Sequence, residues 1–134
     1  FQLFASASYL ARAGTPRGVG ELPAHQCVNF RGAPWPGNER GNKRRMTLVP
    51  RVESDEMFFV RASIRAGIGI GGMPTFLVGD DLAAGTLVRV LPRWSHDIGS
   101  VYLVHPARKH VPRRVTAFQE LAVEALRHSP LGAR

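Results

Sequence analysis

Side chains that could act as nucleophiles or metal ligands are few in this sequence. Cys27 is the single cysteine and follows His25 by two positions, a spacing that would allow a cysteine–histidine nucleophile pair. Cys27 also begins an apolar stretch, where a buried structural thiol is the better interpretation. The histidines neither pair four residues apart beside a carboxylate nor accompany a second cysteine, so we expect no metal site. They are His25, His96, His105, His110 and His128.

Adjacent carboxylates and a glycine-rich run are the other features that could do chemistry. Asp80 and Asp81 stand between glycines, where a polar turn explains them better than acid–base catalysis does. The run over residues 67–72 follows an expected helix and leads into an expected strand, the reverse of the order that holds a phosphate at a helix N-terminus. Close backbone packing explains its glycines better. The sequence therefore predicts no catalytic centre, no cofactor and no enzyme.

Composition and charge set the class of protein. The chain has 134 residues, of which 44% are hydrophobic, so one ordinary domain can form a core. Its formal net charge of +8 is concentrated in residues 40–45 and 108–114. Solvated surface segments explain these clusters best, and contact with an acidic partner, DNA or an anionic ligand is the alternative. No apolar run has the roughly 20 residues of a membrane helix, and the lone cysteine favours a reducing, cytoplasmic location.

The elements that must position any site alternate between strands and helices, which predicts the α/β class with a mixed or largely parallel sheet. Pro50 interrupts one expected strand and indicates an edge position or a break. The strands are expected at residues 1–5, 27–30, 46–53, 68–73, 87–91 and 101–104.

Serine and aspartate side chains accept hydrogen bonds from the free N–H groups at helix starts, and they mark two helices here. Ser6 or Ser8 would begin a short helix. Ser54 and Asp55 would begin a longer helix over residues 55–66.

Glycine and proline mark where helices end and begin again. Gly14 and Gly67 would end the two helices. Pro74 suits the first turn of a third helix that runs through Val78. Residues 115–126 show the clearest amphipathic pattern in the chain and predict the last helix.

Five segments together resemble the LysR-type family of bacterial transcriptional regulators, in the order and at the spacing of that family. Residues 5–16 are similar to its pattern ASPxYLxxxGxP, although Ala7 stands where the family usually has proline. The other four segments are ELPAHQC at 21–27, AGIGIGGMP at 66–74, LAAGTLVRVLPRW at 82–94 and YLVHPARKHVPRRVTAF at 102–118.

This resemblance implies a periplasmic-binding-protein-like (type II) α/β fold, in which a small effector binds in a cleft between two subdomains. Residues 1–97 would form the second subdomain, with its mixed sheet. Residues 98–134 would supply a return strand and a C-terminal helix that pack on a first subdomain absent from this chain. The resemblance further implies a winged helix-turn-helix outside this chain that contacts DNA, a homodimer or homotetramer, and no membrane contact.

Candidate effector-binding residues lie at expected strand and helix ends. The helix start at Ser54 and Asp55 would turn free N–H groups toward the cleft, with Ser54 as a hydrogen-bond donor or simply as a cap. Asp55 would disfavour an anion and favour a cationic or neutral group. Ser6 is a candidate on the hinge side, and Phe30 and Met73 could supply apolar contact or belong to the core.

The helix over residues 55–66 also carries two adjacent phenylalanines. Phe58 and Phe59 cannot both face one core, so we expect at least one to be exposed. The resemblance places this helix and the following strand in an antiparallel dimer contact. The residues of this chain that would form the contact are Phe58, Phe59, Arg61 and Ile68.

The alternatives to a regulator are a solute-binding protein of a transport system with the same fold, and a small enzyme with a new site.

Overall fold

The computed structural model describes the chain except for residues 34, 36–47, 97–101, 105–111 and 129–134. The chain divides into two compact units, Phe1–Ile98 and Gly99–Arg134. The basic segment 40–45 and residues 108–110 of the second basic cluster lie outside the described residues. None of the described helices is both long enough and apolar enough to cross a membrane.

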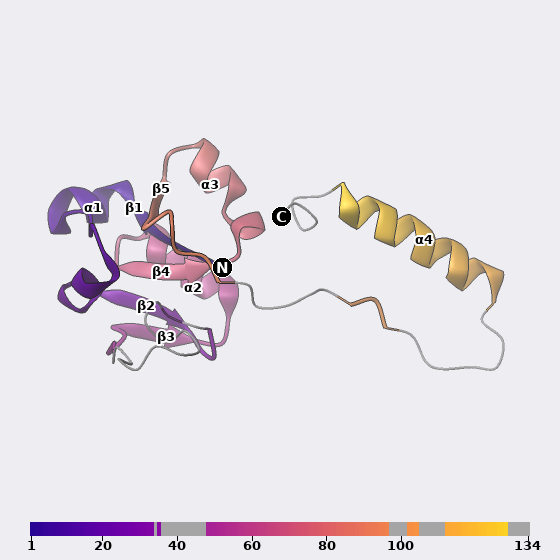
Figure 1. Ribbon diagram of the computed structural model, residues 1–134, viewed down its shortest axis with the longest axis horizontal. Coiled ribbons are helices and arrows are strands. Elements are labelled where there is room, and N and C mark those ends of the chain that lie inside the picture. The colour runs from indigo at the N-terminus through magenta and orange to yellow at the C-terminus, as the bar shows by residue number, and fades with distance from the viewer. Residues whose placement is uncertain (34, 36–47, 97–101, 105–111, 129–134) are drawn as a thin grey trace. The chain divides into compact units, whose positions relative to one another are not determined.

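The first unit is built on a five-stranded sheet (Figure 1). The strands are β1 (Gln2–Ser6), β2 (Cys27–Phe30), β3 (Val52–Ser54), β4 (Ile70–Met73) and β5 (Leu87–Val90), in the order β3-β2-β4-β1-β5. β2 runs parallel to β3 and β4, whereas β1 runs antiparallel to β4 and β5. The prediction of a mixed sheet is therefore confirmed, and β3 lies at an edge, as Pro50 indicated.

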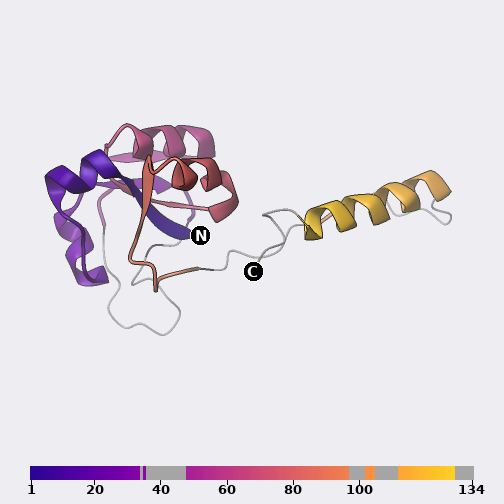
Figure 2. The same cartoon turned by 90° about the horizontal axis from the view of Figure 1, so that it is seen from above.

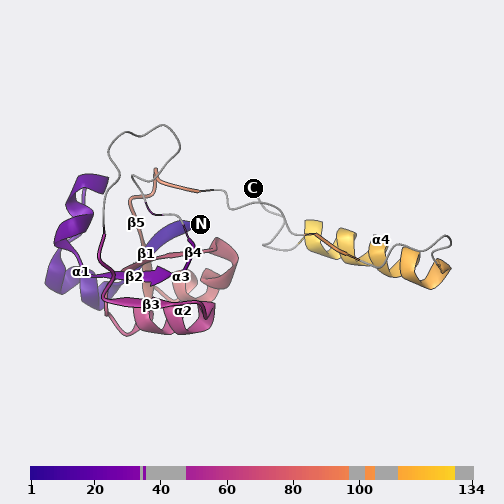
Figure 3. The same ribbon diagram turned by 90° about the horizontal axis from the view of Figure 1, so that it is seen from below.

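Helices cover both faces of this sheet (Figures 2 and 3). Successive residues of β1 point to opposite faces. Leu3 packs in a cluster with residues of α1 (Ala7–Ala13) and the 3₁₀ helix η1 (Val19–Ala24). Phe4 packs in a second cluster with α2 (Met57–Arg65). The core thus has two layers, one on each side of the strands.

Helix α1 begins and ends where the sequence predicted. The Ser6 hydroxyl accepts a hydrogen bond from the N–H of Tyr9 at 3.2 Å, which satisfies one free donor of the first turn. Gly14 ends the helix with φ 83°, a left-handed conformation that glycine adopts without strain, and its N–H donates to the carbonyl of Leu10 at 2.9 Å.

Glycines allow α2 and β2 to approach β4 closely. A Cβ on Gly71 would lie 2.5 Å from Cδ1 of Ile64 in α2 and 2.9 Å from the carbonyl oxygen of Val28 in β2. A Cβ on Gly69 would collide with the carbonyl of Gln26. The prediction that this glycine run serves close packing is confirmed, because side chains at these positions would push the helix away from the sheet.

The third helix was predicted with the wrong bounds. Pro74 is followed by a short 3₁₀ helix, η2 (Thr75–Leu77), and the α-helix α3 occupies Gly79–Ala83, where a closing turn was expected. Val78, with φ −119°, interrupts the two. Helix propensity alone did not predict the position of α3, because a buried ion pair with α2 fixes it.

The expected strand over residues 101–104 is not formed at Tyr102–Val104, and Val101 lies outside the described residues. A strand requires a hydrogen-bonded neighbour, and no described residue pairs with this segment. The second unit does contain the predicted amphipathic helix, α4 (Arg113–Arg127). Phe118 and Leu121 on α4 are 62% and 66% exposed, so the described residues of the second unit do not cover this apolar face.

Asp81 of α3 ties three elements together. Its side chain is only 3% exposed and accepts hydrogen bonds from Nε of Arg61 at 2.7 Å and from Oγ1 of Thr86 at 3.1 Å. Nε of Arg65 lies 3.2 Å from its second oxygen. The carboxylate thereby links α2, α3 and the turn before β5. The polar turn proposed for Asp80 and Asp81 was therefore wrong for Asp81, because its carboxylate is buried between two helices.

Asp81→Ala is expected to destabilise the domain by about 2 kcal/mol or more, because it leaves two arginines without their acceptor and empties a buried polar position. Urea unfolding would measure the change. Asp80→Ala is the matched control, since Asp80 lies next in sequence on the same helix but is exposed; we expect it to change stability by less than about 0.5 kcal/mol. Equal losses in the two variants would contradict a structural role for the Asp81 ion pairs.

Candidate functional site

One edge of the sheet collects the ends of several strands. The parallel strands β2, β3 and β4 end there at Phe30, Ser54 and Met73. Phe30 is level with Ser54, and Met73 is level with Gln2 at the start of β1. Ligands of open α/β sheets bind outside the carboxyl ends of the strands. A ligand of this fold is therefore expected at this edge.

The start of α2 at this edge differs from the prediction. The helix begins at Met57, and its N-cap is Glu56 instead of Ser54 or Asp55. The Glu56 carboxylate accepts hydrogen bonds from the N–H groups of Phe58 at 2.9 Å and Phe59 at 2.6 Å. The N–H groups that were expected to face a ligand thus already have a carboxylate partner. This helix end does not offer them to an anionic ligand.

Ser54 and Asp55 lie just before that cap. The Ser54 hydroxyl accepts a hydrogen bond from the N–H of Glu56 at 3.0 Å, so it shapes the turn into α2. Asp55 is exposed. Beside them, Glu53 accepts a hydrogen bond from Nδ2 of Asn29 at 2.7 Å. Exposed carboxylates therefore predominate at this end of β3.

Two further candidates do not lie on the accessible edge. Met73 is fully buried and packs in the cluster below α2, so its side chain belongs to the core. Ser6 lies at the opposite end of β1, where it pairs with Leu87 and is 2% exposed. Because β1 runs antiparallel to β4, it carries Ser6 away from the ends of the parallel strands, so the structure does not bring Ser6 together with the other candidates. Phe30, by contrast, is half-buried at the edge.

The same edge brings together Phe1 and His96, which are distant in sequence. The Phe1 nitrogen donates to the carbonyl of His96 at 2.7 Å, and the N–H of His96 donates back to the carbonyl of Phe1 at 2.9 Å. Because Gln2 is paired with Met73, this reciprocal pair lies at the edge where the parallel strands end.

The outer surface of α2 is apolar. Phe58 is 63% exposed and Phe59 is 52% exposed, so both phenylalanines lie outside the core. The other two predicted interface residues are less available. Arg61 is held by Asp81, and Ile68 is half-buried against the core below α2.

A family model described as the LysR substrate binding domain matches residues 1–127. This chain belongs to that family.

The relatives of this LysR-type domain are named as HTH-type transcriptional regulators. CrgA of Neisseria meningitidis serogroup C is 30% identical over an alignment 141 residues long, and this alignment covers 98% of this chain and 46% of CrgA. YhjC of Escherichia coli is 32% identical over 125 residues, which cover 87% of this chain and 41% of YhjC. The chain spans less than half the length of the curated relatives it matches.

Solved structures agree with this assignment. The CrgA regulatory domain superposes with a TM-score of 0.69 at 29% identity, covering 93% of this chain and 63% of that chain. The regulatory domain of AphB from Vibrio vulnificus superposes with a TM-score of 0.72 at 23% identity, covering 92% of this chain and 63% of that chain. The fold is therefore the periplasmic-binding-protein-like type II fold of LysR regulatory domains. The transport-protein alternative is not favoured, and the relatives are regulators and not enzymes.

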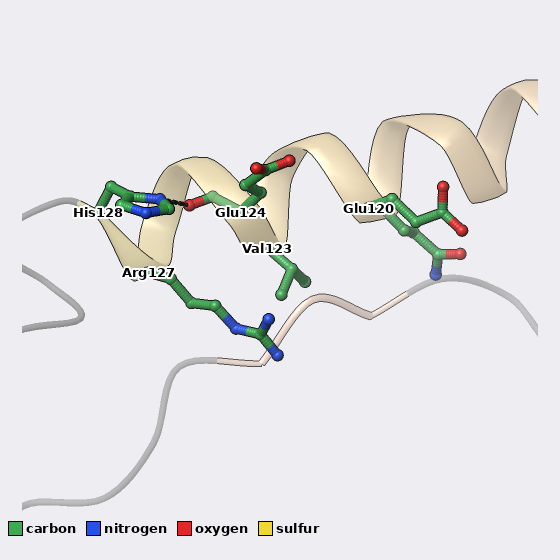
Figure 4. A pocket seen from close by; sticks show the side chains of 6 residues that line it. Glu120, Val123, Glu124, Arg127 and His128 are labelled. Carbon is green, nitrogen blue, oxygen red and sulfur yellow. Dashed lines mark hydrogen bonds between the residues drawn. The ribbon is translucent and has the colours of Figure 1, made fainter.

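A shallow pocket on α4 does not bring together residues from several elements, as the sheet edge does (Figure 4). The side chains that line it all belong to α4 and its C-cap, and a hydrogen bond of 2.9 Å joins Nδ1 of His128 to the carbonyl of Glu124. They are Gln119, Glu120, Val123, Glu124, Arg127 and His128. Among the residues that the structure describes, no group of three or more His, Cys, Asp or Glu side chains could hold a metal ion.

Sequence reasoning missed Glu56, the residue that caps α2 at this sheet edge. Glu56 stands three residues before Phe59, the spacing at which a capping side chain reaches a backbone N–H, but the serine and aspartate before it are stronger caps by type. A second missed residue, Asp81, has a signal in the sequence. Arg61 and Arg65 are spaced so that both lie on one side of α2, where a single carboxylate can reach them.

Cys27 is a buried structural thiol, as predicted. It is 1% exposed, and burial raises the pKa of the thiol from 9.0 to about 11. The reactive form of cysteine is the thiolate, so a raised pKa makes Cys27 less reactive at neutral pH.

We expect Cys27 to react with a disulfide reagent such as DTNB at least about 100-fold more slowly in the folded domain than in denaturant at pH 8. A thiol with pKa 9.0 is about a tenth ionised there, whereas a thiol with a pKa of about 11 is about a thousandth ionised. Absorbance at 412 nm would follow the reaction. A folded-state rate that matches the denatured rate would contradict this burial.

Proposed function

We propose that this LysR-type domain is the effector-sensing part of a DNA-binding transcriptional regulator, and that a small molecule binds at the sheet edge beside Phe30, Ser54 and Asp55. The observation that carries the proposal is the shared edge of β2 and β3, where Phe30 and Ser54 end neighbouring parallel strands and Asp55 follows directly after β3. The effector would act by binding one arrangement of the regulator more tightly than another.

The rest of the regulator follows from the family resemblance. Residues 1–97 would supply one wall of the cleft, and residues 98–134 would cross to the first subdomain, where the apolar face of α4 would be covered. A winged helix-turn-helix outside this chain would contact DNA. The regulator would be cytoplasmic, without catalytic activity, and would bind neither a metal nor a cofactor.

Phe1 and His96 support the two-subdomain arrangement. Their reciprocal hydrogen bonds hold two segments of chain side by side at the proposed cleft edge. Two such segments are what a hinge between subdomains requires, because both must cross at one place.

A thermal-shift screen of small metabolites on the protein encoded by the complete gene would test the proposal. We expect a metabolite to raise the melting temperature without being consumed, and to change the affinity for promoter DNA in a gel-shift assay. A compound that raises the melting temperature and is turned over to product would contradict the regulator proposal.

The cleft residues can be tested on any metabolite found in that screen. Asp55→Asn is expected to weaken its binding by about tenfold if a cationic or hydrogen-bond-donating group lies against Asp55. Asp80→Asn removes the same charge from an exposed position on α3 and should leave the affinity unchanged. Equal affinities in the two variants would remove Asp55 from the site.

A dimer contact through the outer face of α2 is the second part of the proposal. Phe58 and Phe59 expose apolar rings on one helix, and buried aromatic residues dominate the energetics of many interfaces. Arg61 would contribute less, because Asp81 already binds it. Ile68 would contribute only through the part of its side chain that the core leaves open.

Phe58→Asp is expected to shift the complete protein toward a smaller oligomer in analytical ultracentrifugation, because a charge would be desolvated in the contact. Val88→Asp is the matched control, since it places the same charge on an exposed apolar residue of β5. If Phe58→Asp sediments like the wild type, the α2 contact is excluded.

A further inference from the structure

A hollow lies between the loop after α1 and the turn after β5, away from β2 and β3. It has a volume of about 640 Å³, within the range of small-molecule sites. Its apolar lining comes from Pro16, Val19, Leu91, Pro92 and Trp94. β1 and β4 separate β5, which leads into this hollow, from the strands that end at Phe30 and Ser54.

The turn that lines this hollow is strained. Leu91 has φ 50°, a left-handed conformation that leucine rarely adopts. Its carbonyl accepts a hydrogen bond from the N–H of Trp94 at 2.8 Å, so the strained residue sets the position of the indole. Backbone strain of this kind is concentrated at ligand-binding and functional sites.

Trp94 carries an unused hydrogen-bond donor. Its side chain is 7% exposed, and its buried Nε1 has no hydrogen-bond partner among the residues that the structure describes. Buried donors are nearly always paired, so such a group calls for an explanation. The other tryptophan shows the usual arrangement, because Nε1 of Trp35 donates to Oδ1 of Asn29 at 2.5 Å.

Positive charge surrounds the same hollow. Arg17, Arg89 and Arg93 line it and are exposed. Among the described residues, none of these three guanidinium groups has a carboxylate partner, whereas Arg61 and Arg65 share Asp81. An apolar cavity beside three unpaired guanidinium groups is complementary to a molecule that has an apolar body and a carboxylate.

We propose that this hollow is a binding site for a small apolar carboxylate, such as a cyclic or aromatic acid, that is separate from the cleft edge. The ring lies against the prolines, Leu91 and the indole of Trp94. The carboxylate pairs with Arg17 and Arg93, and a turn of the indole on binding brings Nε1 of Trp94, which is closed to solvent in the free structure, to an acceptor atom of the ligand. The site does not depend on the cleft proposal, since it shares no residue with it.

Nitrogen–proton correlation spectra of this chain test the proposal directly, because its two tryptophans give two indole N–H signals. Trp94→Phe assigns them, and the Trp35 signal is an internal control. We expect cyclohexanecarboxylate to shift the Trp94 signal downfield with saturation in the millimolar range or below. Cyclohexanecarboxamide, which lacks the charge, and acetate, which lacks the ring, should bind at least about tenfold more weakly.

Charge-matched variants show whether the arginines act locally. Arg17→Ala and Arg93→Ala should each weaken cyclohexanecarboxylate binding by about tenfold, whereas Arg113→Ala, which removes the same charge from exposed α4, should not change it. The proposal is overturned by an unsaturable shift, by equal binding of acid and amide, or by an equal effect of Arg113→Ala. Binding of an acidic peptide in the absence of any binding of cyclohexanecarboxylate would also overturn it, in favour of a protein partner.

Discussion

The buried carboxylate of Asp81 determines where α2 can lie, and the proposed effector edge and the proposed dimer face both depend on that helix. Arg61 and Arg65 project from one side of α2 to the same carboxylate, while Ile64 packs onto the bare backbone of Gly71 below it. A charged anchor and a close apolar contact together leave the helix little freedom to rotate or slide. The start of α2 is thereby held at the sheet edge, and its outer face is held toward solvent.

Local rules predicted the parts of this fold that local chemistry decides. Ser6 caps α1 and Gly14 ends it, because a hydroxyl and a left-handed glycine act within a few residues of their own position. The same rules chose Ser54 over Glu56 at α2. There the outcome depends on which side chain reaches two N–H groups at once, and the longer glutamate does so.

Features that depend on distant partners were harder to predict. Met73 was a candidate contact, but whether a residue at a strand end faces core or cleft depends on the register of its neighbours. Ser6 lies apart from the other candidate residues, and the sequence did not show this because strand direction within a mixed sheet is not encoded locally. The strand expected at Tyr102–Val104 has no neighbour among the described residues, so its apolar pattern does not become a strand.

Helix α2 is apolar on both sides, and this affects how the molecule behaves in concentrated solution. Val60 and Ile64 are buried on the inner side, whereas Phe58 and Phe59 are exposed to solvent and attract other apolar surfaces at short range. The net charge of +8 repels copies of the chain over a longer range, about 10 Å at 0.1 M salt. Colloidal stability is therefore a balance between these two ranges. Added salt shortens only the repulsion, so it favours self-association through the phenylalanines.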